Sequence, residues 1–330
     1  MRQVRIQGEA TAAGARSRAV VRRRAGRRLL VGPWLGEVGF ELLYWIPFVR
    51  KLIADAGVPA DRVLVLSRGG VEDWYGDAFG GYLDLYDLFD PDDLYARQRA
   101  RMRISEKQMT ITDLERDALT RAERHMGEKF AVLHPYLMFR RFRPVWMRRR
   151  TMSAVRRELA PEPIRPLARP ERLPPRYVAV KLYSSRCFPL DEDAAEAVLD
   201  TVRRSTGDLP LVPLLAGAQV DDHADLIRPE GRPSASELAS NLRTQTAIVQ
   251  HADAMVSTYG GFAYLGALSG IPTFGLYQRA NFNMLHLDVL SDAASRLAPS
   301  PEVALSLINI AHLRRAAGVL SADYSVSAKR

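Results

Sequence analysis

Residues 252–277 read ADAMVSTYGGFAYLGALSGIPTFGLY, and this stretch decides the fold class. Its apolar and glycine-bounded segments predict, in order, a buried strand at Ala254–Ser257, a turn at Tyr259–Gly261, a helix at Phe262–Ser269 and a strand at Thr273–Tyr277. Gly270 and Pro272 would end the helix. Two strands joined through a helix lie parallel in one sheet, so the stretch predicts an α/β fold with a parallel sheet.

The turn in this stretch has the features of an anion site. The first strand ends in Ser257-Thr258, and Gly260 and Gly261 let a ligand approach the backbone closely. A helix then begins at once, and its free N–H groups and positive dipole end suit a pyrophosphate. In an open parallel sheet, ligands bind at the carboxyl ends of strands, where this turn falls. The competing interpretation is an ordinary turn whose glycines serve tight packing.

The same alternation of strands and helices extends outward in both directions. The N-terminal half predicts a strand at Arg28–Gly32, a helix at Glu41–Ile53, a strand at Arg62–Ser67 and mostly helical structure over residues 91–130. The C-terminal half adds strands at Tyr177–Tyr183 and Leu209–Leu215, helices at Leu190–Arg204 and Ser236–Gln250, and a last helix over residues 302–318. Six prolines fall within residues 160–175, a density that interrupts helices and strands alike.

These features predict two Rossmann-like α/β domains. The expected divisions are a disordered basic tail at 1–28, an N-terminal domain at 29–160, a proline-rich linker at 161–176, a C-terminal domain at 177–300, and a helix and tail at 301–330.

Charge and composition narrow the function classes. The net charge is +9, but residues 1–28 alone carry nine arginines and one glutamate. A nucleic-acid-binding protein usually spreads positive charge over a folded face, so nucleic acid is not an expected partner. The single cysteine, Cys187, excludes a disulfide framework. Because no apolar run has the length of a signal peptide or a membrane span, we expect a cytoplasmic protein.

The familiar cofactor and metal signatures are missing from the sequence. It contains no GxGxxG after the first strand, no phosphate-loop lysine, no HExxH and no GxSxG. The Asp-x-Asp matches at Asp90-Pro-Asp92 and Asp191-Glu-Asp193 fall where helices are expected to start. We therefore expect neither a bound metal nor a cofactor.

Residues 252–277 resemble the donor-binding stretch of two-domain GT-B glycosyltransferases, and most closely that of the heptosyltransferase family. There, an aspartate-led strand, a Gly/Ser-rich turn, a helix of small residues and a Gly-x-Pro recur. The family also carries Gly-Asp after its first strand, with a proline six residues beyond the Asp. Here Glu41 stands six residues before Pro47, with Phe40 in place of the glycine, while Gly36-Glu37 offers a second glycine–acid pair. The resemblance covers residues 29–70 and 177–285.

The resemblance implies two domains that face each other across a cleft and transfer a sugar from a nucleotide-sugar donor to a glycan or glycolipid acceptor of the cell envelope. An inverting transfer needs a base for the acceptor hydroxyl. Glu37 and Glu41 are the only acids between the first expected strand and Asp55. The proline spacing slightly favours Glu41, the glycine–acid pair favours Glu37, and a helix cap or an ion pair is the structural alternative for either.

The resemblance also assigns the donor site. The loop after the strand at Tyr177–Tyr183 would face the cleft, so Lys181 or Arg186 would neutralise the diphosphate, and Arg offers bidentate geometry. The turn residues Ser257, Thr258, Tyr259, Gly260 and Gly261 would surround the donor. Gln278, Asn281 and His286 follow the last core strand and would reach the ribose or the sugar.

A basic segment at residues 139–157 interleaves arginines with bulky apolar side chains, a pattern typical of an interfacial anchor on anionic lipid. It would place the protein at the inner face of the plasma membrane, and a solvated helix is the alternative. The residues expected to contact the membrane are Phe139, Arg140, Arg141, Phe142, Trp146, Arg148, Arg149 and Arg150.

Two other functions fit the same sequence. One is a non-catalytic protein of this fold that binds a nucleotide or a membrane. The other is a transferase of a different group, such as pyruvyl, to a glycan.

Overall fold

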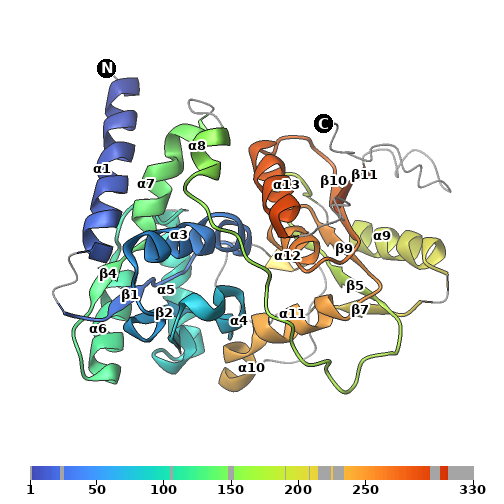
Figure 1. The fold of residues 1–330 in the computed structure, drawn as a ribbon. Helices are drawn as coiled ribbons and strands as arrows, with labels where there is room; N and C mark the ends of the chain where they lie inside the picture. Colours follow the sequence, from blue (N-terminus) through green and yellow to red (C-terminus); the bar gives the residue numbers. More distant parts are fainter. Residues whose placement is uncertain are drawn as a thin grey trace. The chain divides into compact units, whose positions relative to one another are not determined.

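A computed structural model describes residues 2–22, 26–104, 107–147, 152–189, 191–207, 209–214, 224–225, 234–297 and 305–310. The chain divides into two compact units. Unit 1 holds the chain up to Arg165 together with Ser234–Leu242, and unit 2 holds the other described residues from Pro166 onward. Each unit is an α/β structure around a parallel sheet (Figure 1), which is the fold class that the sequence predicts.

Unit 1 is built on a four-stranded sheet of order β3-β2-β1-β4, in which every pairing is parallel. Its strands are β1 (Leu29–Val31), β2 (Val63–Ser67), β3 (Gly81–Asp84) and β4 (Ala131–Leu133). Its helices are α1 (Arg2–Arg22), α2 (Val38–Phe40), η1 (Glu41–Trp45), α3 (Ile46–Ala56), η2 (Ala60–Arg62), α4 (Glu72–Tyr75), η3 (Gly76–Ala78), η4 (Leu85–Asp87), α5 (Pro91–Ile104), α6 (Asp113–Met126), α7 (Pro135–Trp146), α8 (Met152–Arg156) and α10 (Ala235–Ala239). β1 and β2 are buried along their whole length, as parallel strands covered on both faces are.

The expected disordered tail is wrong for residues 2–22, which form helix α1 and pack against α7 (Figure 1). The buried side of α1 is made of small and aliphatic side chains at helical spacing, namely Ile6, Ala10, Ala13, Ser17 and Val21. Small side chains let two helices approach each other closely.

The expected regular helix over Glu41–Ile53 is two elements. Residues Glu41–Trp45 form η1, a π-helical turn, and α3 follows with Pro47 in its first turn. Proline has no N–H to donate to the carbonyl four residues earlier, so the standard ladder cannot run through this point. π-turns are rare and often lie at functional sites.

A cluster of aromatic rings joins η1 and α3 to α7. The ring of Trp34 stacks on those of Trp45 and Phe139, with centroids 5.9 Å apart in both pairs. Phe142 of α7 lies against Tyr44 at 5.9 Å and Phe48 at 5.5 Å. This cluster is the part of the core that supports the loop after β1.

Unit 2 contains a five-stranded parallel sheet of order β11-β10-β9-β5-β7. Its strands are β5 (Val178–Lys181), β7 (Leu211–Pro213), β9 (Ala254–Thr258), β10 (Thr273–Tyr277) and β11 (Leu305–Asn309), and β6 (Tyr183–Ser184) pairs with β8 (Ala224–Asp225) in a separate antiparallel ribbon. Its helices are α9 (Glu192–Ser205), α12 (Gly261–Leu268) and α13 (Leu285–Leu297), and α11 (Asn241–Gln250) lies in unit 2 from Arg243 onward.

Two expectations for the C-terminal part need correction. The expected last helix at 302–318 is wrong where the structure describes it, because Leu305–Asn309 forms β11 and pairs with β10. The segment Ser234–Leu242 belongs to unit 1 rather than to the expected C-terminal domain. There, α10 packs against η4. The passage between the units at Arg165–Pro166 lies within the proline-rich segment.

Candidate functional site

In unit 1 the strand order reverses beside β1, which has β2 on one side and β4 on the other. Ligands of open α/β sheets bind where the order reverses, at the carboxyl ends of the strands. Two chain segments leave the sheet together at this point, because Val31 of β1 pairs with Leu133 of β4 and the Gly32 N–H donates to the Leu133 carbonyl at 3.1 Å. One segment is the loop at residues 32–37, which we call the β1 loop, and the other begins at His134.

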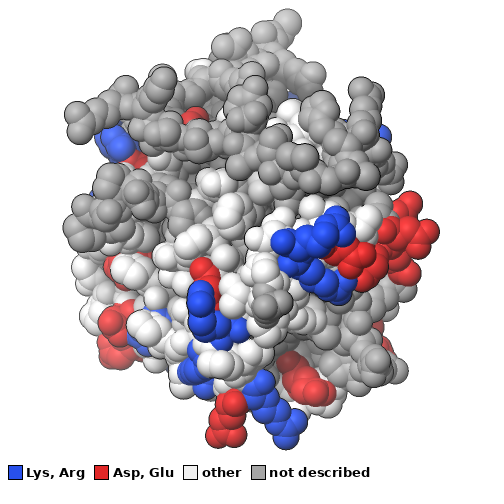
Figure 2. Space-filling model, turned by 90° about the vertical axis from the view of Figure 1, so that its right-hand side faces the viewer, with Lys and Arg blue, Asp and Glu red and all other residues white. Residues whose placement is uncertain are grey.

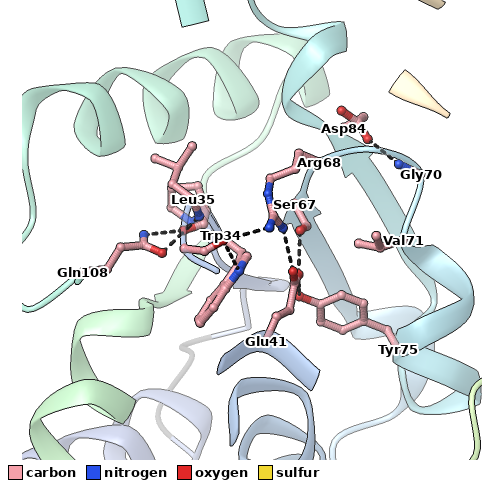
Figure 3. Close-up of polar contacts among 12 residues, drawn as sticks. Trp34, Leu35, Glu41, Ser67, Arg68, Gly70, Val71, Tyr75, Asp84 and Gln108 are labelled. Atoms are coloured by element: carbon pink, nitrogen blue, oxygen red, sulfur yellow. Dashed lines mark hydrogen bonds and ion pairs between the residues drawn. The ribbon is translucent and has the colours of Figure 1, made fainter. Parts of the chain in front are cut away.

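Buried amide side chains fasten the β1 loop (Figure 3). Gln108 accepts a 3.0 Å hydrogen bond from the Leu35 N–H and donates one of 2.9 Å to the Pro33 carbonyl. Gln98 of α5 donates to the Leu35 carbonyl at 2.7 Å. The loop is therefore held through its backbone by side chains that lie far away in the sequence.

Glu41 is wholly buried behind the β1 loop. Its Oε1 accepts hydrogen bonds from Ser67 at 2.7 Å and from Tyr75 at 2.9 Å, and its Oε2 accepts one from Arg68 at 2.6 Å (Figure 3). Arg68 also donates to the Gly36 carbonyl at 2.7 Å. Burial first, and then the charge of Glu41, raises the pKa of Tyr75 well above its ordinary value, so this phenol stays a donor. With three donors and no exposed surface, Glu41 ties η1 to the end of β2.

Glu37 differs from Glu41 because it reaches solvent. It stands before α2 with 23% of its side chain exposed, and it forms an ion pair with Lys107. The ammonium of Lys107 also lies 4.7 Å from the centroid of the Phe40 ring. Of the two glutamates that the sequence singles out, Glu37 is therefore the one that a substrate can reach in this structure.

His134 begins α7 at the same edge of the sheet and is buried. Its Nδ1 accepts a hydrogen bond of 3.1 Å from the Tyr136 N–H, which caps the helix and leaves the proton on Nε2. That Nε2 is buried, has no hydrogen-bond partner among the described residues, and lies 3.8 Å from Glu115. Burial and the nearby charge of Arg101 lower the pKa of His134 to about 3, so the ring is neutral.

A second polar cluster lies at the carboxyl ends of β2 and β3. The carboxylate of Asp84 accepts a hydrogen bond of 2.9 Å from the Gly70 N–H (Figure 3). It also accepts hydrogen bonds from the Tyr86 N–H at 2.9 Å and from the Tyr82 hydroxyl at 2.8 Å. Burial raises the pKa of Asp84 to about 6 despite these donors. The cluster fixes the Gly69-Gly70 turn after β2.

In unit 2 the strand order reverses between β5 and β9, so the loops after these strands form the corresponding edge. The Thr258 hydroxyl, at the end of β9, joins the two loops. It donates to the Tyr183 carbonyl at 2.9 Å and accepts from the Tyr183 N–H at 3.0 Å. Ser257 donates to the Thr258 carbonyl at 2.9 Å, and both side chains are fully buried. The two expected donor residues Ser257 and Thr258 therefore support the loops from inside.

Gly260 is required by a close approach within the protein. A Cβ at this position would lie 2.2 Å from the Tyr183 hydroxyl, and its φ of 156° is one that other residues rarely adopt. The chain then enters α12 at Gly261. The first N–H groups of a helix have no partners within the helix, so the turn presents donors and a positive dipole end.

Lys181 and Arg186, the two expected diphosphate partners, lie in different surroundings. Lys181 is buried, donates to the Leu214 carbonyl at 3.0 Å, and has its ammonium 4.9 Å from the Phe262 ring centroid. Its charge is held inside unit 2 rather than displayed to a ligand. Arg186 is exposed on the loop after β6, where its carbonyl accepts a 3.1 Å hydrogen bond from Asn281. Of the two side chains, that of Arg186 is therefore the one that is exposed.

The residues after β10 lie close to the same loop. The N–H of Gln278 donates to the Cys187 carbonyl at 2.7 Å, which brings this segment beside Arg186. The ring of Tyr259 packs on Phe282 at 4.3 Å, and its hydroxyl bonds to Tyr264 at 3.0 Å. Tyr259 is thus a buried packing residue, while Gln278 and His286 are partly exposed.

The expected membrane contact of Phe139 and Phe142 is wrong, because both rings are buried in the aromatic cluster. The ring of Trp146 also packs there, against Phe40 and Tyr44. Arg141 pairs with Glu158 at 2.6 Å. Arg140 lies over the ring of Tyr136, and Arg148, Arg149 and Arg150 fall outside the described residues.

None of the helices that the described residues form is long and apolar enough to cross a membrane. Within the same part of the chain, no group of three or more His, Cys, Asp or Glu side chains could hold a metal ion. On the described surface in Figure 2, basic and acidic side chains lie next to one another.

This chain is similar to solved structures, three of which have the following identity, coverage and TM-score. The iron-containing dodecameric glycosyltransferase TibC from enterotoxigenic E. coli H10407 is 14% identical over 76% of this chain and 58% of TibC, with a TM-score of 0.41. TibC as a heptosyltransferase in complex with ADP-D-β-D-heptose gives 15% identity, the same coverage and a TM-score of 0.40. The glycosyltransferase SnogD from Streptomyces nogalater is 16% identical over 82% of this chain and 84% of SnogD, with a TM-score of 0.35.

No protein-family model and no curated protein sequence matches the chain. The chain spans 58% of the length of TibC. These structures are described as those of glycosyltransferases, and TibC is described as a heptosyltransferase.

Proposed function

We propose that this protein is a glycosyltransferase that moves a sugar from a nucleotide-sugar donor to a hydroxyl group of a cell-envelope glycan or glycolipid. The observation that carries the proposal is the Thr258–Tyr183 pairing in unit 2. It holds the loops after β5 and β9 together where the strand order reverses, directly before the N-terminus of α12. A nucleoside diphosphate is the ligand chemistry that this arrangement suits.

The donor would bind through backbone and exposed side chains. The N–H groups of Gly261 and the next residues of α12 would donate hydrogen bonds to the diphosphate, and the guanidinium of Arg186 would neutralise its charge. Gln278 and His286 are the partly exposed candidates for the ribose or the sugar. Four of the expected donor residues have buried side chains and would support the loops without contacting the donor, namely Lys181, Ser257, Thr258 and Tyr259. Gly260 would support them through its close approach to Tyr183.

The base would be Glu37. A base must come within hydrogen-bond reach of the acceptor hydroxyl, and Glu41 is enclosed by Ser67, Arg68 and Tyr75. In the transfer, the acceptor oxygen attacks the anomeric carbon while its proton passes to the Glu37 carboxylate. The bond from the anomeric carbon to the diphosphate breaks, and the nucleoside diphosphate leaves with the bonding electron pair. No metal or cofactor enters this scheme.

Nucleotide binding tests the donor site. A thermal-shift series with UDP, GDP, CMP and ADP should raise the unfolding temperature for the cognate nucleotide. Gly261→Val should weaken that binding and leave the unfolding temperature of the free protein unchanged. Gly8→Ala is the control, because a Cβ there meets no atom within 4 Å and Gly8 has no positive φ. Stabilisation by none of the nucleotides would contradict the proposal.

Sugar transfer tests the base. Glu37→Gln should lower kcat by roughly 10²- to 10⁴-fold and leave nucleotide affinity unchanged. Transfer at the wild-type rate by this variant would remove Glu37 from the scheme.

A further inference from the structure

Two consecutive residues between α5 and α6, Lys107 and Gln108, contact the β1 loop. Lys107 forms the ion pair with Glu37, and Gln108 binds the backbone of the same loop at Pro33 and Leu35. One contact therefore reaches the carboxylate, and the other reaches the backbone that carries it. Residues so distant from the β1 loop in the sequence meet it only through the fold.

Gln108 is anchored independently of the β1 loop. Its amide also donates to Glu115 Oε1 at 2.8 Å, and Glu115 Oε2 accepts a 2.8 Å hydrogen bond from the Thr112 hydroxyl in the capping box of α6. Gln108, Thr112 and Glu115 are all buried. The β1 loop is thus attached to the rigid start of α6, and Lys107 is held beside it.

Lys107 sits at the solvent edge of this attachment. Its side chain is 31% exposed and that of Glu37 is 23% exposed. The ammonium lies between the Glu37 carboxylate and the face of the Phe40 ring. A cation over an aromatic ring is attracted to it, so two contacts restrict the ammonium.

We propose that Lys107 is a positioning residue for the Glu37 carboxylate, and that Gln108 positions the backbone of the β1 loop. The proposal rests on the role of Glu37 as the base. A fixed ammonium beside a carboxylate favours its ionised form, the form that accepts a proton. It also selects one orientation of the carboxylate, and misplacement by about 1 Å can cost roughly 100-fold in rate. Lys107 keeps its own proton throughout the transfer.

Other charged groups near the β1 loop have partners that hold them in place. The guanidinium of Arg68 binds the Gly36 carbonyl and Glu41, and that of Arg101 binds Gln98 and the Leu35 carbonyl. Both contact the loop at its backbone. Lys107, in contrast, pairs with the Glu37 side chain itself.

The test compares Lys107→Met, Lys107→Arg and the control Lys129→Met. Lys129 is a surface lysine of unit 1 that is 71% exposed and pairs with Glu123, so its replacement makes the same change in net charge elsewhere. Lys107→Met should lower kcat roughly 10- to 100-fold with unchanged nucleotide affinity and unfolding temperature. The acid limb of its pH–rate profile should move to higher pH. Lys107→Arg should keep kcat and the acid limb of the pH–rate profile close to those of the wild type. Lys129→Met should resemble the wild type.

A titration of the Glu37 side-chain carboxyl by carbon-13 NMR gives a readout that needs no turnover. The carboxyl should titrate at higher pH in Lys107→Met than in the wild type. An unchanged kcat and an unchanged titration in Lys107→Met would overturn the positioning role and leave the base assignment intact if Glu37→Gln still loses transfer. Normal transfer by Glu37→Gln would overturn the base assignment and the inference with it.

Discussion

The guanidinium of Arg68 donates a 2.6 Å hydrogen bond to the carboxylate of Glu41, and neither side chain has more than 3% of its surface exposed. The pair joins the residue after β2 to the π-turn η1, and the second arm of Arg68 holds the Gly36 carbonyl of the β1 loop. A buried ion pair brings two desolvated charges together, so each partner depends on the other. The pair therefore links the β1 loop to the end of β2 and to η1.

Glu41→Gln should destabilise the protein. It leaves the buried charge of Arg68 facing a neutral amide, and removing one partner of a buried pair costs about 3–5 kcal/mol. Urea unfolding at neutral pH measures the loss. Glu37→Gln is the matched control, because a partly exposed ion pair contributes only about 0–1 kcal/mol. A fully stable Glu41→Gln variant that had lost transfer would return the role of base to Glu41.

Gly260→Ala should destabilise unit 2 through the Tyr183 hydroxyl. The added Cβ would lie 2.2 Å from that oxygen, while the next ring atom, Cζ, is 3.4 Å away. In a Tyr183→Phe background the hydroxyl is gone, so the same substitution should cost less in free energy of unfolding. A double-mutant cycle by urea unfolding measures this coupling. Equal costs in both backgrounds would show that the backbone conformation alone, at φ 156°, requires glycine here.

Much of the sheet architecture was predictable from local patterns. The strands β1, β2, β5, β9 and β10 are buried apolar runs close to glycines or prolines, and such runs show in the sequence. β3 and β4 were not predicted, because both are partly exposed, whereas β1, which is as short, is buried along its whole length. The sequence predicts a helix where β11 lies, because the conformation of this segment depends on its pairing with β10, a contact that the local pattern does not show.

Only some residues of the candidate site could be predicted from the sequence. Glu37, Glu41 and the Gly260-Gly261 turn follow strands, so their place at the sheet edge could be predicted. Gln98, Arg101, Gln108 and Glu115 could not, because they lie in a charged helical region whose burial depends on tertiary contacts. A buried polar residue has no local signature. In this region, the capping box of Thr112 and Glu115 was the one available signal.

The packing of α1 on α7 gives a direct test of the corrected N-terminus. Val21 is fully buried and Ala19 is exposed on the same helix. Val21→Asp should lower the free energy of unfolding by about 3 kcal/mol, because it removes a buried apolar side chain and places an unpaired charge there. Ala19→Asp makes the same change in charge and should have little effect. Equal stability of the two variants in urea would contradict the packing of α1.

His134 should make the protein less stable as the pH falls below about 6.5. Burial and Arg101 lower its pKa to about 3 in the folded state, whereas an unfolded histidine titrates near the ordinary value of 6.5. Between these values the unfolded chain binds a proton that the folded one rejects, so the free energy of unfolding decreases as the pH falls.

The variant that isolates this effect is His134→Asn. Asparagine is one of the preferred N-cap residues, so its side chain can accept the hydrogen bond from the Tyr136 N–H while the titrating ring is removed. The stability of the wild type relative to the variant should fall by roughly 2 kcal/mol between pH 7 and pH 5. Asp84 and the other buried acids titrate in both proteins, so their contributions cancel in the difference. A difference that stays constant over this range would mean that His134 binds its proton equally well in the folded and unfolded chains.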